Sequence, residues 1–192
     1  IEGSTLTINT DLDFNGSIEA FVTVKDTSDI YDSGSFTLTV TPVNDAPVLE
    51  EIADQIINED SFLNIPVFAS DIDGDELVLS VNVDGNGDAI FIGTELTITP
   101  DENYHGDIQV TVTVTDGEIP VSTTFTLTVE PVNDAPTLGN LPGDATVEED
   151  GVYVLELNAN DIDEDLLTFE ASINANGNIS IDGSTLTINT DL

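Results

Sequence analysis

The stretch Gln109-Val110-Thr111-Val112-Thr113-Val114 alternates strictly between polar and apolar side chains. Successive side chains of a β-strand point to opposite faces, so the pattern predicts a half-buried strand with threonines on the wet face. The same alternation recurs in Glu95-Leu96-Thr97-Ile98-Thr99 and in Thr124-Phe125-Thr126-Leu127-Thr128-Val129. No stretch has the helical period over three turns, so we expect almost no helix.

Breaks in the alternation divide this region into short segments. They fall at residues 71–75, 84–88, 100–106 and 116–120. About seven strands then occupy about 90 residues, which is the strand number and size of an immunoglobulin-like sandwich. The dipeptides Asn86-Gly87 and Asn176-Gly177 are typical of tight hairpin turns, which we expect at both places.

The chain repeats itself. Residues 1–12 return at 181–192 with a single change, and glycines at positions 3, 93 and 183 set a period of 90 residues. The motif PVNDAP recurs at 42–47 and 131–136, an offset of 89, so one residue is inserted in the first copy between positions 26 and 36.

We take the PVNDAP motif as the boundary between repeats. On this basis we expect the C-terminal half of one repeat over residues 1–46, a complete repeat over 47–135, and the N-terminal part of a further repeat over 136–192.

The charge is extremely one-sided. The 192 residues include 39 Asp and Glu but one Lys and one His, which gives a net charge of −38. This excludes nucleic acid and an anionic membrane surface as electrostatic partners and favours cations. We expect no membrane insertion, because no apolar run approaches a membrane span. Without cysteine, cohesion beyond the core must come from hard cations bound by oxygen or from contacts between chains.

Most acidic residues lie in the breaks between strands. Two turns carry an aspartate at every second position: Asp71, Asp73 and Asp75, and Asp161, Asp163 and Asp165. Such turns can bring several oxygens to one point, as Ca²⁺ requires. An EF-hand is excluded, because its sixth and twelfth loop positions would be Glu76 and Asn82 instead of Gly and Glu. A solvated acidic loop remains the alternative.

Five motifs in constant order give the chain its family resemblance. They are Glu-Asp before the second strand (59–60 and 149–150), the D-x-D turn, the turns PDENYHG and TDLDFNG, a strand ending in Asp26 or Asp116, and Asn-Asp-Ala-Pro. In this order the chain resembles tandem bacterial cadherin-like repeats of large surface proteins. The resemblance implies an all-β fold of tandem immunoglobulin-like, seven-strand β-sandwiches in a linear rod.

In cadherins, calcium ions lie in the joint between consecutive domains, and the resemblance implies such joints here. The first joint would use Asp11 or Asp13, Asn44, Asp45, Asp71, Asp73 and Asp116. The second joint would use Glu59, Asp101 or Glu102, Asn133, Asp134, Asp161 and Asp163. Cadherins carry an acidic residue two positions before the linker Asn, where this chain has Pro42 and Pro131, so fewer or weaker ions are expected. Plain acidic loops of a salt-adapted extracellular protein are the alternative.

The two incomplete repeats predict a partner of a particular kind. Each would expose strand edges and an apolar face, which invites pairing with another copy of the chain, head to tail. Glu149 of a neighbour would then supply the missing glutamate of the first joint, and Asp26 of a neighbour the missing strand-end aspartate of the second. The alternative is that this sequence is a part of a longer repeat protein, whose next repeat is joined covalently.

These features predict an extracellular structural and adhesive module, in a cell-surface protein or secreted filament, whose joints are stiffened by calcium. The alternative is a carbohydrate-binding module with a polysaccharide partner, although the chain has no Trp and three Tyr to stack on sugar rings. We expect no enzyme activity, since the sequence pairs no nucleophile with a base and has no phosphate-binding glycine loop.

Overall fold

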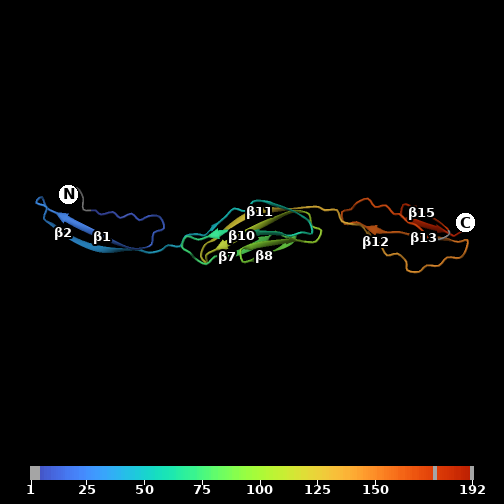
Figure 1. Cartoon of the computed structure of the whole chain (residues 1–192), viewed down its shortest axis with the longest axis horizontal. Helices are drawn as coiled ribbons and strands as arrows, with labels where there is room; N and C mark the ends of the chain where they lie inside the picture. Colours follow the sequence, from blue (N-terminus) through green and yellow to red (C-terminus); the bar gives the residue numbers. More distant parts are fainter. Residues whose placement is uncertain (1–4, 175–176, 191–192) are drawn as a thin grey trace. The chain divides into compact units, whose positions relative to one another are not determined.

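The computed structural model describes residues 5–174 and 177–190. Every regular element among them is a β-strand (Figure 1). No helix in these ranges is long and apolar enough to cross a membrane. The chain divides into two compact units. The first consists of the described residues up to Ile57 with Ser61–Pro100 and Asp107–Thr128, and the second of Asn58–Asp60, Asp101–Gly106 and the described residues from Val129 onward.

Residues 48–130 form a sandwich of two main sheets, which we call the central sandwich. One sheet has the order β4-β11-β10-β7 and the other the order β5-β9-β8. Their strands are β4 (Gln55–Asn58), β5 (Leu63–Pro66), β7 (Val78–Val83), β8 (Gly87–Ile92), β9 (Glu95–Pro100), β10 (Gly106–Thr115) and β11 (Pro120–Glu130). A short pair, β3 (Val48–Leu49) and β6 (Ala69–Ser70), lies beside them. Seven strands of four or more residues match the expected number.

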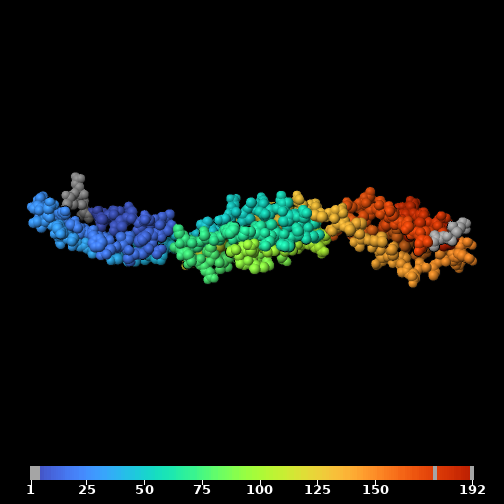
Figure 2. Space-filling model, viewed as in Figure 1, coloured from blue at the N-terminus to red at the C-terminus, as the bar shows by residue number. Residues whose placement is uncertain are grey.

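The core follows the alternation in the sequence. In β10 the side chains of Ile108, Val110, Val112 and Val114 are fully buried, and the residues between them are partly or fully exposed. The other buried apolar residues are Leu63, Val67, Leu96, Ile98, Phe125, Leu127 and Val129. In the space-filling view these strands form a closely packed body, coloured cyan to yellow-green (Figure 2). The prediction of half-buried strands is confirmed.

The expected hairpin at Asn86-Gly87 is wrong. Strand β7 pairs with β10, whereas β8 pairs with β9, so this turn carries the chain from one sheet to the other. Gly87 is needed for a different reason, because a Cβ there would lie 2.7 Å from the carbonyl oxygen of Thr99. The tight hairpin of this sheet is the β8–β9 connection at Gly93, whose φ is +67°. Asn176 lies outside the described residues.

The N-terminal region forms one long hairpin. Strands β1 (Gly16–Lys25) and β2 (Tyr31–Val40) pair over their whole length, with Gly16 opposite Val40 and Lys25 opposite Tyr31. Most of its side chains are exposed on both faces, including large apolar ones such as Phe21. Residues 5–10 form no strand.

The C-terminal region reproduces the first half of the central sandwich. Its sheet has the order β13-β16-β15, with β13 (Val152–Glu156), β15 (Asn178–Asp182) and β16 (Thr185–Asn189). A short pair joins β12 (Thr137–Leu138) to β14 (Ala159–Asn160). The register is also conserved between repeats, because Leu155 lies opposite Leu186 just as Ile65 lies opposite Leu96.

Candidate metal centres

Each linker aspartate is bonded to the acidic turn that follows it. The backbone N–H of Asp45 donates to Oδ2 of Asp73 at 2.8 Å, and that of Asp134 donates to Oδ2 of Asp163 at 2.7 Å. Residues far apart in the sequence therefore meet in the same way at both joints. The structure thus brings together the linker and turn aspartates that the sequence assigned to each joint.

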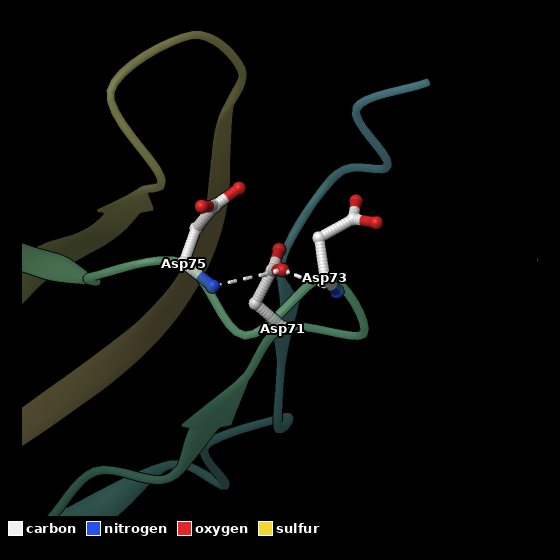
Figure 3. Close-up of side chains that lie close together, drawn as sticks. All are labelled: Asp71, Asp73 and Asp75. Atoms are coloured by element: carbon white, nitrogen blue, oxygen red, sulfur yellow. Dashed lines mark hydrogen bonds between the residues drawn. The ribbon is translucent and has the colours of Figure 1, made fainter. Parts of the chain in front are cut away.

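The first aspartate of each turn fixes the local backbone. Oδ1 of Asp71 accepts the N–H groups of Asp73, Gly74 and Asp75 at 2.8, 3.1 and 3.5 Å. Figure 3 shows the Asp71 carboxylate between Asp73 and Asp75, with its bonds to their backbone nitrogens. One carboxylate oxygen from each of the three residues lies within 4.8 Å of the others. The turn is therefore held by its own backbone, and three carboxylates gather at one point.

Two buried carboxylate oxygens are left without a hydrogen-bond partner. They are Oδ2 of Asp71 and Oδ2 of Asp134, one at each joint. An ionised oxygen shielded from water and unpaired is costly, so such atoms in a native structure call for a ligand or an ion. Both atoms belong to residues that the sequence assigned to metal binding.

Negative charge is concentrated around Asp45 at the first joint. Partial burial and the nearby carboxylates of Asp13, Asp73 and Asp71, in that order, raise the pKa of Asp45. A hollow beside it is lined by residues of the hairpin end, the linker and the acidic turn, including Asp13, Asp45 and Asp73. Asp13 adopts a left-handed backbone, with φ of +57°.

The second joint gathers more carboxylates. Partial burial raises the pKa of Asp134, and four neighbours raise it further: Asp60, Asp163, Glu59 and Asp161. Asp60 is absent from the predicted ligand set. Its Oδ1 accepts the backbone N–H of Asn103 at 3.0 Å. Its position next to Glu59 in the repeated Glu-Asp motif was the signal that could have included it.

Glu59 is buried and firmly placed, with 4% of its surface exposed. Its Oε1 accepts the backbone N–H of Val132 at 2.6 Å, and its own N–H donates to the carbonyl of Glu130 at 2.9 Å. Its Oε2 lies 3.8 Å from Nδ1 of His105, whose side chain is mostly exposed. Glu59 therefore holds the segment that follows β4 against the end of β11 and the start of the second linker.

Asn44 and Asp116 are linked at the first joint. Nδ2 of Asn44 donates to Oδ2 of Asp116 at 2.8 Å. The backbone N–H groups of Ile119 and Glu118 donate to Oδ1 of Asp116 at 2.6 and 2.7 Å. These three bonds hold the pKa of Asp116 below its usual value. At the second joint, Nδ2 of Asn133 donates to the carbonyl oxygen of Asp134 at 2.8 Å.

Five other predicted ligands do not take part in the contacts given above. Among the described residues, the charges that shift the pKa of Asp45 and Asp134 do not include those of Asp11, Asp26, Asp101, Glu102 or Glu149. Oδ1 of Asp26 accepts the N–H groups of Ser28 and Ile30 at 2.8 and 2.9 Å. By the 90-residue offset, the counterpart of Asp13 is Asn103, and neither Asp101 nor Glu102. The metal roles of these five residues, like those of all the other predicted ligands, stay predictions.

The central sandwich matches a known family of protein domains. Residues 44–130 match the family described as bacterial Ig domain. The fold class is therefore all-β, with a tandem immunoglobulin-like β-sandwich architecture. A search of curated proteins gave no match. The finer assignment to cadherin-like repeats stays a prediction.

Several solved structures resemble the chain in fold. Human protocadherin-24 EC1-2 has a TM-score of 0.41 and 19% identity, covering 78% of this chain and 80% of that one. The titin domains Z1Z2 in complex with telethonin have a TM-score of 0.39 and 16% identity, covering 76% and 81%. The endo-fucoidan hydrolase MfFcnA4 of glycoside hydrolase family 107 has a TM-score of 0.39 and 17% identity. That match covers 93% of this chain but 30% of the hydrolase.

Proposed function

We propose that this chain is an extracellular structural or adhesive repeat module whose two joints bind calcium. The immunoglobulin-like match of the central sandwich supports a structural role, since such domains are typically extracellular and non-enzymatic. The observation that carries the calcium proposal is the pair of buried, unpartnered carboxylate oxygens, on Asp71 and Asp134, each inside a cluster of like charges.

The donor set fits calcium. Both clusters offer carboxylate oxygens, which are ligands of a hard cation with six to eight coordination positions. Magnesium demands a tighter octahedron and retains its water, which suits these turns less well. At the first joint the candidate ligands are Asp13, Asp45, Asp71 and Asp73, and at the second Glu59, Asp60, Asp134, Asp161 and Asp163.

A bound cation would change the energetics of each joint. Without it, the carboxylates around Asp45 and Asp134 repel one another, and this repulsion adds to partial burial in raising the pKa of each. With it, the linker and the following turn would share one ion in addition to the Asp45–Asp73 and Asp134–Asp163 bonds. The ion would hold each linker against its turn and so limit bending there.

Calcium binding is tested by calorimetry and thermal unfolding of the full chain. Ligand linkage predicts a gain of about 2.7 kcal/mol at one hundred times the dissociation constant, seen as a higher melting temperature than in the metal-free protein. We expect magnesium at the same concentration to give a smaller increase. Equal melting temperatures with and without calcium, together with no heat of binding, would exclude the proposal.

A matched pair of variants separates binding from a general charge effect. Asp134→Asn removes one carboxylate from the second joint, whereas Asp88→Asn removes one from β8, at a position where the next repeat carries Asn178. Both variants change the net charge equally. We expect Asp134→Asn to reduce the calcium response and Asp88→Asn to leave it unchanged.

A further inference from the structure

Asn86 lies in the turn that carries the chain from one sheet of the central sandwich to the other. This turn occupies residues 84–86, between the end of β7 at Val83 and the start of β8 at Gly87. Asn86 is exposed and has a left-handed backbone, with φ of +60°. Asparagine is one of the few residues with a side chain that adopts this conformation readily, so the turn favours it at this position.

The side-chain amide of Asn86 is not engaged. Within the described part of the chain, it forms no hydrogen bond. Other asparagines use theirs: Nδ2 of Asn44 donates to Asp116, and Nδ2 of Asn133 donates to the carbonyl oxygen of Asp134. No such bond holds Cγ of Asn86 away from the backbone nitrogen that follows it.

That backbone nitrogen, of Gly87, lies outside the hydrogen-bond ladder of the sheet. Gly87 is opposite Pro100 in the pairing of β8 with β9. Proline has no N–H, so the two residues cannot exchange both bonds and must form the non-hydrogen-bonded kind of pair. The N–H of Gly87 then points away from β9, and β8 is the end strand of its sheet. Glycine also has no side chain to shield this nitrogen.

The packing of β8 against β9 keeps a glycine at position 87. A Cβ there would lie 2.7 Å from the carbonyl oxygen of Thr99 and 2.8 Å from Cα of Pro100, both of them backbone atoms. The turn thus favours asparagine, and the sheet contact requires the glycine after it. Asparagine is a chemically labile residue, and an unhindered nitrogen after it is the arrangement in which its amide is most easily lost. The fold itself therefore maintains a reactive pair.

We propose that Asn86 is a self-modification site, at which asparagine converts to aspartate and isoaspartate without an enzyme. The Gly87 nitrogen attacks Cγ of Asn86, the Cγ–Nδ2 bond breaks, and the amide group leaves as ammonia with the proton of the Gly87 N–H. The product is a cyclic imide, which water opens. Hydrolysis of the Cγ–N bond gives aspartate, and hydrolysis of the backbone C–N bond gives isoaspartate. Water is the co-reactant, and no oxidation or reduction takes place.

The two products differ in how they fit the turn. Aspartate can adopt the same left-handed conformation, and it adds one negative charge between Asp84 and Asp88. Isoaspartate adds a methylene group to the main chain directly before Gly87, where the backbone of β8 packs against Thr99. The isoaspartate form must therefore displace the start of β8 from β9. We expect that form to melt at a lower temperature than the native chain, and the aspartate form to melt close to it.

A second Asn-Gly pair, Asn15-Gly16, provides an internal comparison. Gly16 lies opposite Val40 in the β1–β2 hairpin. At the closed end of this hairpin the N–H of Asp26 donates to the carbonyl oxygen of Ile30 at 2.9 Å, and bonded and non-bonded pairs alternate along an antiparallel ladder. By this alternation the pair of Gly16 and Val40 is a bonded one. The N–H of Gly16 is therefore directed at Val40, which restrains its attack on Asn15.

Peptide mapping of the full chain measures the reaction at each site. The protein is incubated in mildly alkaline buffer, either native or in urea, and is then cleaved after glutamate. Residues 77–95 form one peptide, with Asn82 and Asn86, and residues 3–19 form another, with Asn15. Mass spectrometry with electron-transfer fragmentation locates the conversion and distinguishes aspartate from isoaspartate. Asn82, which precedes a valine, is the slow control within the first peptide.

Each native rate is divided by the rate of the same site in urea, so that differences between the two sequences cancel. We expect this ratio to be near one for Asn86, because no hydrogen bond of the folded state restrains the reaction. For Asn15 it should be about fivefold lower or less, which is the effect of one retained hydrogen bond. A ratio for Asn86 equal to or below that for Asn15 would overturn the inference. The reaction needs no cation, so this outcome is independent of the calcium proposal.

Asn86→Gly is the matched variant for the consequence of the reaction. Glycine adopts a positive φ without strain, so the turn is kept while the reactive amide is removed. We expect the melting temperature of the native chain to fall during incubation as isoaspartate accumulates in the 77–95 peptide. The Asn86→Gly chain, which retains every other asparagine, should lose less. Equal losses, despite isoaspartate at position 86 in the native chain, would contradict the proposed displacement of β8.

Discussion

The backbone N–H of Asp134 donates a hydrogen bond of 2.7 Å to Oδ2 of Asp163, 29 residues further along the chain. The side chain of Asp134 lies in the same cluster, and its Oδ2 is buried without a partner. One residue thus holds the linker against the acidic turn through its backbone and offers an unsatisfied oxygen through its side chain. Asp45 makes the equivalent backbone bond to Asp73.

The second and third aspartates of the first turn, Asp73 and Asp75, should differ in their effect on calcium binding. Both residues donate a backbone N–H to Asp71, but the carboxylate of Asp73 also accepts the N–H of Asp45, and its charge contributes to the raised pKa of Asp45. We expect Asp73→Ala to weaken calcium binding at the first joint by about tenfold or more, and Asp75→Ala to weaken it less. Titration calorimetry in an Asp134→Asn background, which suppresses the second joint, measures both. Equal losses would mean that the turn binds calcium as a local unit.

Stability of the metal-free chain should depend on pH with a definite sign. The raised pKa of Asp45 and of Asp134 means that the folded state binds protons more tightly there than the unfolded chain, whose aspartates titrate near pH 3.9. When ionised, these two carboxylates destabilise the folded state, and this effect is fully present at neutral pH. It is relieved as the pH falls through their raised pKa values. The lowered pKa of Asp116 acts oppositely: its stabilisation is present above about pH 3.9 and is lost as the pH falls through its folded value.

We therefore expect the metal-free chain to be more stable at mildly acidic pH than at neutral pH, and to lose stability below about pH 3.9. Urea unfolding of the metal-stripped protein across this range gives the profile. The double variant Asp45→Asn and Asp134→Asn should show a flatter slope between neutral and mildly acidic pH. If its slope equals that of the native chain, the two joints do not cause the dependence.

The strands of the central sandwich could be predicted because their sequence signal is local. Alternation in residues 109–114 identifies both the strand and its buried face, and the structure buries Val110, Val112 and Val114 as expected. Pairing between strands is not local. The dipeptide Asn86-Gly87 has the composition of a hairpin turn, but its two flanking strands each have a better partner elsewhere, so the turn connects two sheets.

Only part of the candidate site could be predicted from the sequence, because the site also depends on contacts between distant segments. The motif order located the linker and turn aspartates, whose backbone bonds the structure contains at both joints. It did not include Asp60, whose charge raises the pKa of Asp134, although Asp60 is adjacent to Glu59 in the repeated Glu-Asp motif. The motif order locates residues along the chain, but which carboxylates meet at a joint depends on contacts between distant segments, such as the bond from the Asn103 N–H to Asp60.

Equivalent leucines in two repeats should differ in their contribution to stability. Leu127 in β11 is fully buried, and its counterpart Leu38 in β2 is partly exposed. We expect Leu127→Ala to lower the free energy of unfolding by about 2–5 kcal/mol, because it leaves a cavity in a packed core. Leu38→Ala should cost clearly less at concentrations where the chain is monomeric. Denaturant unfolding followed by circular dichroism measures both values, and equal losses would mean that the hairpin face is also packed in the monomer.

Gly87 should be intolerant of a side chain although it lies in a strand. A Cβ there would lie 2.7 Å from the carbonyl oxygen of Thr99 and 2.8 Å from Cα of Pro100, the residue opposite in β9. Both atoms are backbone, so Gly87→Ala must push β8 away from β9, and we expect a loss of about 1–3 kcal/mol. Gly34 in β2 is the matched control, because a Cβ there meets nothing within 4 Å. Gly34→Ala should change stability by less than about 0.5 kcal/mol. Similar values for the two variants in urea unfolding would show that β8 yields at this point, and the glycine would then serve the turn between sheets instead of the strand contact.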